Sequence, residues 1–198
     1  NAQSFEYDYL LDATTQKVNA SADWATASTD IIGDIVKVVE DAKARGVNIT
    51  RAVCNSSVAK NFRTNNALKN AIYVFAGGTV PVTTARALDY IYNETGVRFY
   101  VYDNVYVNAA NGQATKYIPD DTVVFMPDGD LGNTNMGTTP EESDLRNNLN
   151  AEVAIVNGGV AVTTSQIVDP VNVETKVSMV ALPSFERASD IVIMDTDI

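Results

Sequence analysis

Histidine is absent from the 198-residue chain, and Cys54 is the single cysteine. Without histidine, the chain cannot use His-based acid–base chemistry, a Ser–His–Asp triad or a His-ligated metal. One cysteine cannot form an intrachain disulfide, which fits a reducing compartment. Because Cys54 follows the apolar pair Ala52-Val53, a buried structural thiol is favoured over a nucleophile. The sequence therefore predicts neither a cofactor nor a metal site.

Basic residues are also scarce. The chain has 14 Lys and Arg against 25 Asp and Glu, a net charge of −11. Phosphate contacts need clustered cations, so specific nucleic-acid binding is not expected. No apolar run approaches the roughly 18 to 20 residues that a membrane span needs, and no basic, apolar leader opens the sequence. Hydrophobic residues nevertheless make up 45% of the chain, which predicts a substantial core.

The sequence opens with NAQSFEYDYL and has no initiator Met. Phe5, Tyr7 and Tyr9 alternate with polar residues, a pattern typical of a strand, which we expect over residues 5–11. Such an opening resembles the interior of a protein, so we expect the sequence to be a fragment that lacks an N-terminal region.

The strongest periodic signal is DIIGDIVKVVEDAKAR at residues 30–45. Its isoleucines and valines recur at helical spacing and predict one amphipathic helix. Thr29 or Asp30 can cap its start, and Gly46 suits a left-handed cap at its end. Asp34, like Lys37, is expected on the solvent side. The β-branched residues weaken helix propensity, so the helix needs a sheet or another helix against its apolar stripe.

The remaining elements mix strands and helices without a regular βαβ repeat, which predicts an α+β fold. Helices are expected at 56–64 with a Ser56 or Ser57 cap, at 66–73, and at 85–93 with a Thr83 or Thr84 cap and Leu88, Ile91 and Tyr92 turned inward. Strands are expected at 48–55, 98–103, 105–107, 114–117, 122–126, 152–156, 160–164, 171–182 and 191–194.

Residues 128–150 lack periodicity and are rich in Gly, Asn and Thr, which predicts a long loop. Its acids do not fit an EF-hand: counted from Asp128, the required Gly and Glu positions hold Asn133 and Thr139. A solvated loop or a subunit contact is the favoured interpretation. The candidate subunit-contact residues are Asp128, Asp130, Asn133, Asn135, Glu141, Glu142 and Asp144.

Two other functions stay open on residue patterns alone. Tyr-rich strands and four N-x-[S/T] matches, at Asn19, Asn48, Asn55 and Asn93, would suit an extracellular binding or adhesin-like module. A His-free hydrolase would need two carboxylates in one deep pocket. Its candidates are Asp103, Asp120, Asp121 and Asp128.

Residues 117–145, YIPDDTVVFMPDGDLGNTNMGTTPEESDL, resemble a region of the phage-lambda-type major capsid proteins (the major capsid protein E family). There a Pro-Asp-Asp turn enters an apolar strand, a Pro-Asp-Gly loop follows, and a Gly-Thr-Thr-Pro-Glu-Glu-like stretch comes later. The closing run DPVNVETKVSMVALPSFERASDIVIMDT is similar to the end of that family, and residues 30–46 with ITRAVCNSSVAKNF resemble its helix, strand and second helix.

This resemblance implies an HK97-like capsid fold. Residues 30–45 would form a long spine helix on the β-sheet of a peripheral domain, built from residues 1–49 and 165–198. Residues 50–164 would form an inserted axial domain of mixed sheet and helices. The N-terminal arm and extended loop of the family would be missing.

The implied function is a non-enzymatic structural subunit of an icosahedral phage or prophage head. It would self-assemble into pentamers and hexamers around double-stranded DNA, with possible scaffold and decoration proteins as further partners. It would lie in the virion, and in the host bacterial cytoplasm during assembly, without contact to a membrane.

Overall fold

The structure is a computed structural model that describes residues 7–73, 80–107, 112–140, 152–157, 159–168 and 171–197. The chain forms two compact units. Unit 1 comprises residues 1–129 and 188–198, and unit 2 comprises residues 130–187. Both ends of the sequence therefore contribute to unit 1, and unit 2 is an insertion near its C-terminal end.

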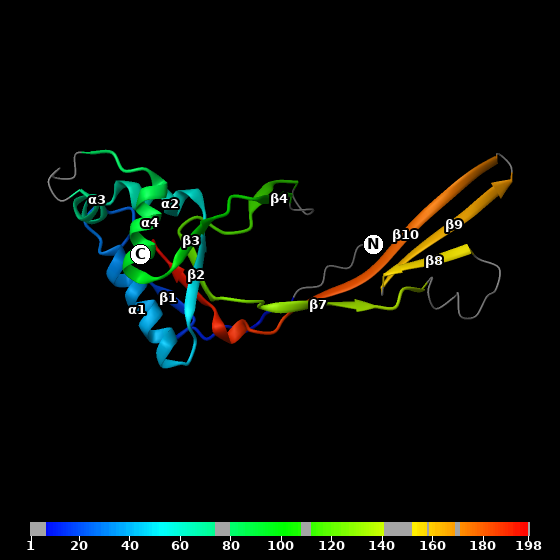
Figure 1. The fold of residues 1–198 in the computed structure, drawn as a ribbon, viewed down its shortest axis with the longest axis horizontal. Coiled ribbons are helices and arrows are strands. Elements are labelled where there is room, and N and C mark those ends of the chain that lie inside the picture. Colours follow the sequence, from blue (N-terminus) through cyan, green and yellow to red (C-terminus); the bar gives the residue numbers. More distant parts are fainter. Residues whose placement is uncertain are drawn as a thin grey trace. The chain divides into compact units, whose positions relative to one another are not determined.

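Unit 1 is built on a five-stranded sheet of order β1-β11-β6-β2-β3 (Figure 1). Strand β2 pairs in parallel with β3 and antiparallel with β6, and β11 joins β6 antiparallel to β1 in parallel. Burial alternates along β6, as expected for a sheet with one covered face. The strands are β1 Lys17–Asn19, β2 Ile49–Cys54, β3 Arg98–Val101, β6 Thr122–Pro127 and β11 Val192–Asp195.

In the described part of unit 1, four helices accompany this sheet: α1 Ile31–Ala44, α2 Ser56–Thr64, α3 Asn66–Ile72 and α4 Thr84–Thr95. Helix α1 confirms the predicted amphipathic helix: Asp30 accepts from Gly33 N, the apolar stripe is buried, and Gly46 has a φ of 82°. It packs against β2 and α4. In α4, Thr83 is the N-cap and Gly96 ends the helix in the left-handed conformation, as predicted.

The core of unit 1 is held by a row of aromatic rings. The Trp24 and Phe62 centroids lie 5.7 Å apart, those of Phe62 and Phe99 5.2 Å, and those of Phe99 and Phe125 6.0 Å. Trp24, Phe62 and Phe125 are fully buried, and burial of such a side chain stabilises a fold by about 1.5–3 kcal/mol. Because these residues come from the N-terminal loop, α2, β3 and β6, the row ties distant segments together.

Several local predictions for unit 1 are wrong. Residues 7–11 are not a strand: Leu10 has a φ of 51° and its N–H bonds Asp8 Oδ1 at 2.9 Å, an Asx-type turn. Asn55, not Ser56 or Ser57, caps α2. In α4, Tyr92 is 42% exposed.

Asp34 also differs from its prediction, because it is buried rather than on the solvent side of α1. Its Oδ2 accepts from Trp24 Nε1 at 2.8 Å and its Oδ1 accepts from Ser21 N at 3.1 Å. These bonds satisfy the carboxylate where the N-terminal loop crosses the helix.

The predicted hairpin around Gly112 is present as a separate antiparallel pair of strands, β4 Val105–Val107 and β5 Ala114–Lys116. Gly112 has a φ of 67°, which suits its turn position. Figure 1 shows this hairpin extending away from α2 and α4. A short 3-10 helix, Ala188–Asp190, leads from the end of unit 2 into β11.

In its described part, unit 2 is a sheet of four strands, in which β10 bonds both β7 and β9, and β9 bonds β8. The predicted strands at 152–156, 160–164 and 171–182 are confirmed and extended. The strands are β7 Gly132–Gly137, β8 Glu152–Asn157, β9 Val160–Val168 and β10 Val171–Phe185. All three pairings are antiparallel.

The predicted α+β class is confirmed, but the compact units divide the chain elsewhere than the expected domains. Residues 1–49 and 50–129 share unit 1 and its sheet. The expected boundary at 164–165 falls within β9. The assignment of peripheral and axial domains stays a prediction.

Candidate subunit-contact site

The predicted contact residues are distributed over three settings. Asp128 and Asp130 are exposed just after β6, and Asn133 and Asn135 are exposed on β7. Glu141, Glu142 and Asp144 lie outside the described residues. The single long loop predicted over 128–150 is therefore wrong at residues 132–137, where β7 pairs with β10.

Strand β7 has the sequence GNTNMG and owes its conformation to its partner. Asn133 Nδ2 donates to Glu186 Oε1 at 3.2 Å, and Leu131 O accepts from the N–H groups of Glu186 and Arg187. A polar strand without alternation carries no local signal, because long-range pairing decides its structure.

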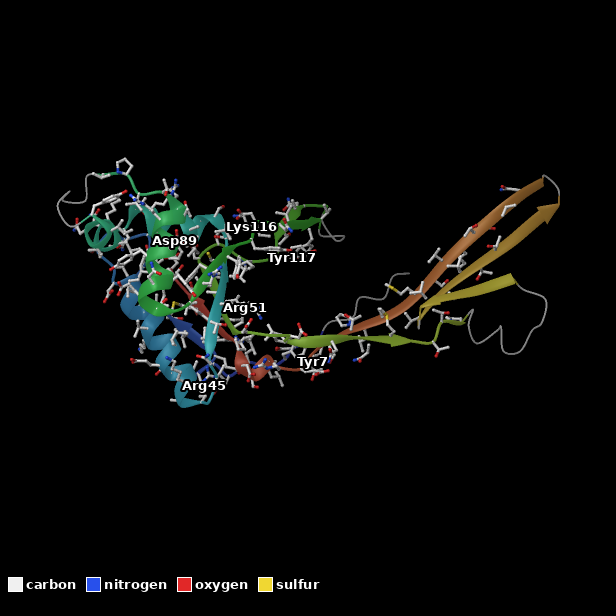
Figure 2. The ribbon with its side chains drawn as sticks, viewed as in Figure 1. Tyr7, Arg45, Arg51, Asp89, Lys116 and Tyr117 are labelled. Carbon is white, nitrogen blue, oxygen red and sulfur yellow. The ribbon has the colours of Figure 1, made fainter. Side chains whose placement is uncertain are left out.

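Arg51 fixes the chain where β6 ends, and sequence reasoning missed it (Figure 2). Its Nε and Nη2 donate to Pro127 O at 3.1 and 2.9 Å, and Nη2 also donates to Gly129 O at 2.6 Å. The planar guanidinium thus donates to two backbone carbonyls, two residues apart, in the segment that follows β6. A lone Arg within the apolar run ITRAVC was the available signal.

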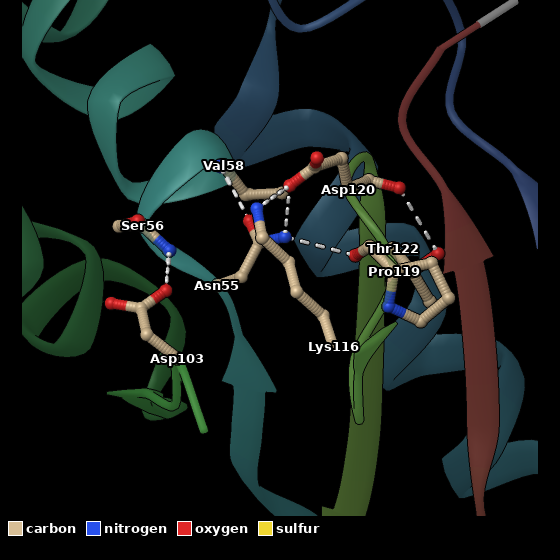
Figure 3. Close-up of polar contacts among 8 residues, drawn as sticks. All are labelled: Asn55, Ser56, Val58, Asp103, Lys116, Pro119, Asp120 and Thr122. Carbon is tan, nitrogen blue, oxygen red and sulfur yellow. Dashed lines mark hydrogen bonds and ion pairs between the residues drawn. The ribbon is translucent and has the colours of Figure 1, made fainter. Parts of the chain in front are cut away.

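A second polar junction ties α2 to the loop before β6 (Figure 3). Asn55 Oδ1 accepts from Val58 N, while Asn55 Nδ2 donates to Pro119 O at 3.0 Å and Asp120 Oδ1 at 2.6 Å. Lys116 forms an ion pair with Asp120 at 2.6 Å. One fully buried Asn side chain therefore joins a helix start, a turn and an ion pair.

Two of the candidate hydrolase carboxylates, Asp103 and Asp120, form hydrogen bonds that hold the local structure. Asp103 Oδ1 accepts from Ser56 N at 2.8 Å. Hydrogen bonds from Lys116 and then Ser57 lower the pKa of Asp120, whereas burial raises the pKa of Asp121. The described cavities, of about 240 and 190 Å³, are lined by none of Asp103, Asp120, Asp121 or Asp128. The described residues thus do not gather these four carboxylates into either cavity.

An exposed aromatic surface, here the tyrosine ribbon, is formed by residues of β3 and β4 and of the segments that directly follow β3 and β5. The Tyr117 ring centroid lies 5.0 Å from that of Tyr106 and 6.2 Å from that of Tyr102. Val105 and Val107, on the other face of β4, are 53% and 69% exposed. An apolar surface of this kind is typical of an interaction site. The sequence predicted these strands but did not predict that their side chains are exposed. The ribbon comprises Tyr100, Tyr102, Val105, Tyr106, Val107 and Tyr117.

Cys54 is buried as predicted, and desolvation raises the pKa of its thiol to about 12. Within the described ranges, no three His, Cys, Asp or Glu residues come together as a metal-binding group. No helix in the described part of the chain has the length and apolarity to cross a bilayer.

The family model for phage major capsid protein E matches residues 1–196, so this chain belongs to that family. The predicted resemblance is confirmed.

Solved structures that share the fold include the following two. One is a phage-related protein from Bordetella bronchiseptica RB50, with a TM-score of 0.59 over 95% of this chain and 60% of that chain. The other, from E. coli CFT073, is assigned as a prophage capsid protein, with a TM-score of 0.58 over 95% of this chain and 54% of that one. Both are 13% identical to this chain, which spans just over half of their lengths. No curated protein matches its sequence.

Proposed function

We propose that this chain is a structural subunit of the icosahedral head of a phage or prophage, and that it self-assembles into pentamers and hexamers. The observation that carries the proposal is the family match over residues 1–196. The exposed tyrosine ribbon and the exposed strands of unit 2 support it, since a shell subunit needs surfaces that fit its neighbours. Scaffold and decoration proteins would be further partners.

The proposal includes an HK97-like fold with α1 as the spine helix of a peripheral domain and residues 50–164 as the axial domain. One observation favours a different assignment of the domains. Helix α1 packs on β2, and β2 belongs to the same sheet as β1 and β11. Unit 1 as a whole would then be one capsid domain, and unit 2 would belong to the other. Density for α1 in an assembled shell would distinguish the two assignments.

The proposed location is the virion, with assembly in the host cytoplasm. The net charge of −11 suits a wall that encloses DNA without binding it tightly, because strong attraction would hinder packaging and release. We expect no retardation of double-stranded DNA by the chain at low salt. Tight binding there would contradict this part of the proposal.

Negative-stain electron microscopy of the protein expressed from its complete gene, with scaffold protein supplied, tests the function. Closed shells, or rings of five and six subunits, are the expected result. A dispersed monomer would overturn the proposal and return attention to the binding-module alternative, for which the tyrosine ribbon would be the contact surface. Turnover of a glycoside substrate that is lost on substitution of Asp103 or Asp121 would instead indicate the hydrolase alternative.

A further inference from the structure

Strand β10 has one edge that no described strand occupies. The strand runs over 15 residues, about 50 Å at 3.3 Å per residue. Residues 171–179 pair with β9 and residues 180–185 pair with β7, both without a register shift. The two partners thus divide the strand between them along its length.

Both partners lie on the same edge of β10. In an antiparallel strand the N–H and C=O of one residue point to the same side, and the side alternates with each residue. Val180 N donates to Gly159 O beside β9, and Glu186 N donates to Leu131 O beside β7. These donors are six residues apart and therefore face the same way. A Cβ built on Gly159 would lie 2.7 Å from the Met136 Cβ, so β7 and β9 meet end to end.

The opposite edge carries the backbone groups of the odd-numbered residues, among them Val173, Thr175 and Val177. Two local features agree with an unpaired edge. Val173 N donates to the neighbouring Asn172 Oδ1 at 2.9 Å, and no described strand accepts from it. Pro183, which has no N–H, occupies an odd-numbered position, and proline within a sheet is confined to edges.

Three of the odd-numbered side chains of β10 are apolar and exposed. Val173, Val177 and Met179 are 58%, 63% and 60% exposed and share one face of the strand. In β9, Val162 lies opposite Val177 and Val160 opposite Met179, which extends the apolar surface. An apolar edge that no described strand occupies can pair with another strand, and soluble proteins normally protect such an edge.

We propose that the free edge of β10 pairs antiparallel with β10 of a second copy of the chain, about a two-fold axis at Thr175. The charges on the strand select this occupant and this register. With Thr175 opposite itself, Glu174 lies opposite Lys176 of the second copy, and the reverse pair forms as well. Val173 lies opposite Val177 of the second copy. A centre one residue away places either Glu174 opposite Glu174 or Lys176 opposite Lys176, which is unfavourable.

This pairing deepens the proposed function and rests on it, since it makes β10 a contact between shell subunits. A single strand pair over residues 171–179 buries less than a standard stable interface. The contact is therefore reversible in dilute solution and becomes populated where other contacts hold the copies together, as in a shell.

Cysteine cross-linking tests the pairing. In the proposed register the two Thr175 Cα atoms lie about 5.5 Å apart, within the range that a disulfide spans. Thr175→Cys should therefore give a cross-linked dimer under mild oxidation, in the complete protein under assembly conditions. Native Cys54 stays in place as a buried, unreactive thiol. Ala181→Cys, on the same edge but outside the paired segment, is the matched control and should cross-link at least tenfold more slowly.

Charge exchange tests the register. In the Thr175→Cys background, Lys176→Glu and Glu174→Lys should each slow dimer formation about tenfold, because each places like charges opposite one another. The double exchange should restore the original rate. Equal cross-linking by all four proteins, or no recovery in the double variant, would overturn the register about Thr175.

The pairing and the proposed function can fail separately. Shells that assemble from Thr175→Cys protein without forming the dimer disulfide would overturn the pairing and leave the shell function intact. A rapid, charge-dependent dimer from protein that never forms rings or shells would support the pairing and contradict the shell function.

Discussion

Units 1 and 2 differ in how far they bury their apolar side chains. Unit 1 covers its sheet with helices, and nearly all buried hydrophobic residues of the described chain belong to it. In unit 2, Ala161 is the one hydrophobic side chain that is buried among those described. Meanwhile Met136, Val173, Val177, Met179, Val180 and Leu182 are all between 45% and 63% exposed.

The difference separates intrinsic stability from assembly. Burial of apolar area is the main favourable contribution to folding, and unit 1 obtains it from its own side chains. An antiparallel sheet without a covered face obtains little of it until another surface arrives. We therefore expect unit 1 to set the stability of the free chain, and unit 2 to gain most from association.

The largest effect in this comparison is expected from a pair of side-chain truncations to alanine, one in each unit. Phe62→Ala should lower the free energy of unfolding by about 3–5 kcal/mol, since it removes the ring between Trp24 and Phe99. Leu182→Ala on β10 removes a 55% exposed side chain and should change it by less than about 0.5 kcal/mol. Urea unfolding followed by far-UV circular dichroism, to which both units contribute, measures both effects, and equal effects would break the comparison.

A second pair compares left-handed glycines in the two units. Gly96 has a φ of 73° with open space around it, so Gly96→Ala should cost only the backbone strain, about 1–2 kcal/mol. Gly159 has a φ of 85°, and a Cβ there would meet the Met136 Cβ at 2.7 Å and Gly137 O at 3.2 Å. Gly159→Ala should therefore cost more, about 2–4 kcal/mol.

Hydrogen exchange of the strand amides reads out the glycine pair by unit. Gly159→Ala should accelerate exchange in β9 and β10, and Gly96→Ala in α4 and β3. If Gly159→Ala accelerates exchange in β9 no more than Gly96→Ala does, the junction of β7 and β9 is loosely packed.

These elements also show how far local sequence can predict the fold. Helix α1 and its caps were predictable, because periodicity and capping act within a few residues. Strand β7 was not, because a polar GNTNMG segment becomes a strand through its pairing with β10. The burial of Asp34 was missed because its partner, Trp24, comes from a loop without periodicity.

The proposed contact surfaces show the same limit. Tyr102, Tyr106 and Tyr117 were visible as strand residues, but their exposure depends on which faces the helices cover. The free edge of β10 follows only from the way in which β7 and β9 share the other edge. The lack of histidine is read directly from the sequence, whereas the proposed contact positions depend on how distant strands pair.

Asp34 offers a test of the polar tie inside unit 1. Asp34→Ala leaves Trp24 Nε1 and Ser21 N without their acceptor, which should lower the free energy of unfolding by about 1–3 kcal/mol. Asp41→Ala, an exposed position on the same helix, is the control and should stay within about 0.5 kcal/mol. If both variants unfold at the same urea concentration, the buried carboxylate contributes nothing to the stability of unit 1.

The smallest expected effect concerns the neighbouring carboxyls Asp120 and Asp121. The pKa of Asp120 is lowered from 3.8 by its hydrogen bond to Lys116, so its contribution to stability is present above the ordinary pKa and is lost as pH falls through the lowered one. Burial raises the pKa of Asp121, so its contribution has the opposite sign and declines as pH rises. Carboxyl-detected NMR titration should therefore find Asp120 below 3.8 and Asp121 above it.

Lys116→Met sharpens this test, because it should raise the pKa of Asp120 toward its ordinary value while Asp121 remains the weaker acid of the two. Lys60→Met, on the exposed side of α2, should move neither pKa. An Asp120 pKa that stays low in Lys116→Met would shift the cause to the hydrogen bonds of Ser57 and Asn55. In that case α2 itself, through its first turn and its cap, would hold the loop before β6, and the ion pair would be a surface contact with little influence on unit 1.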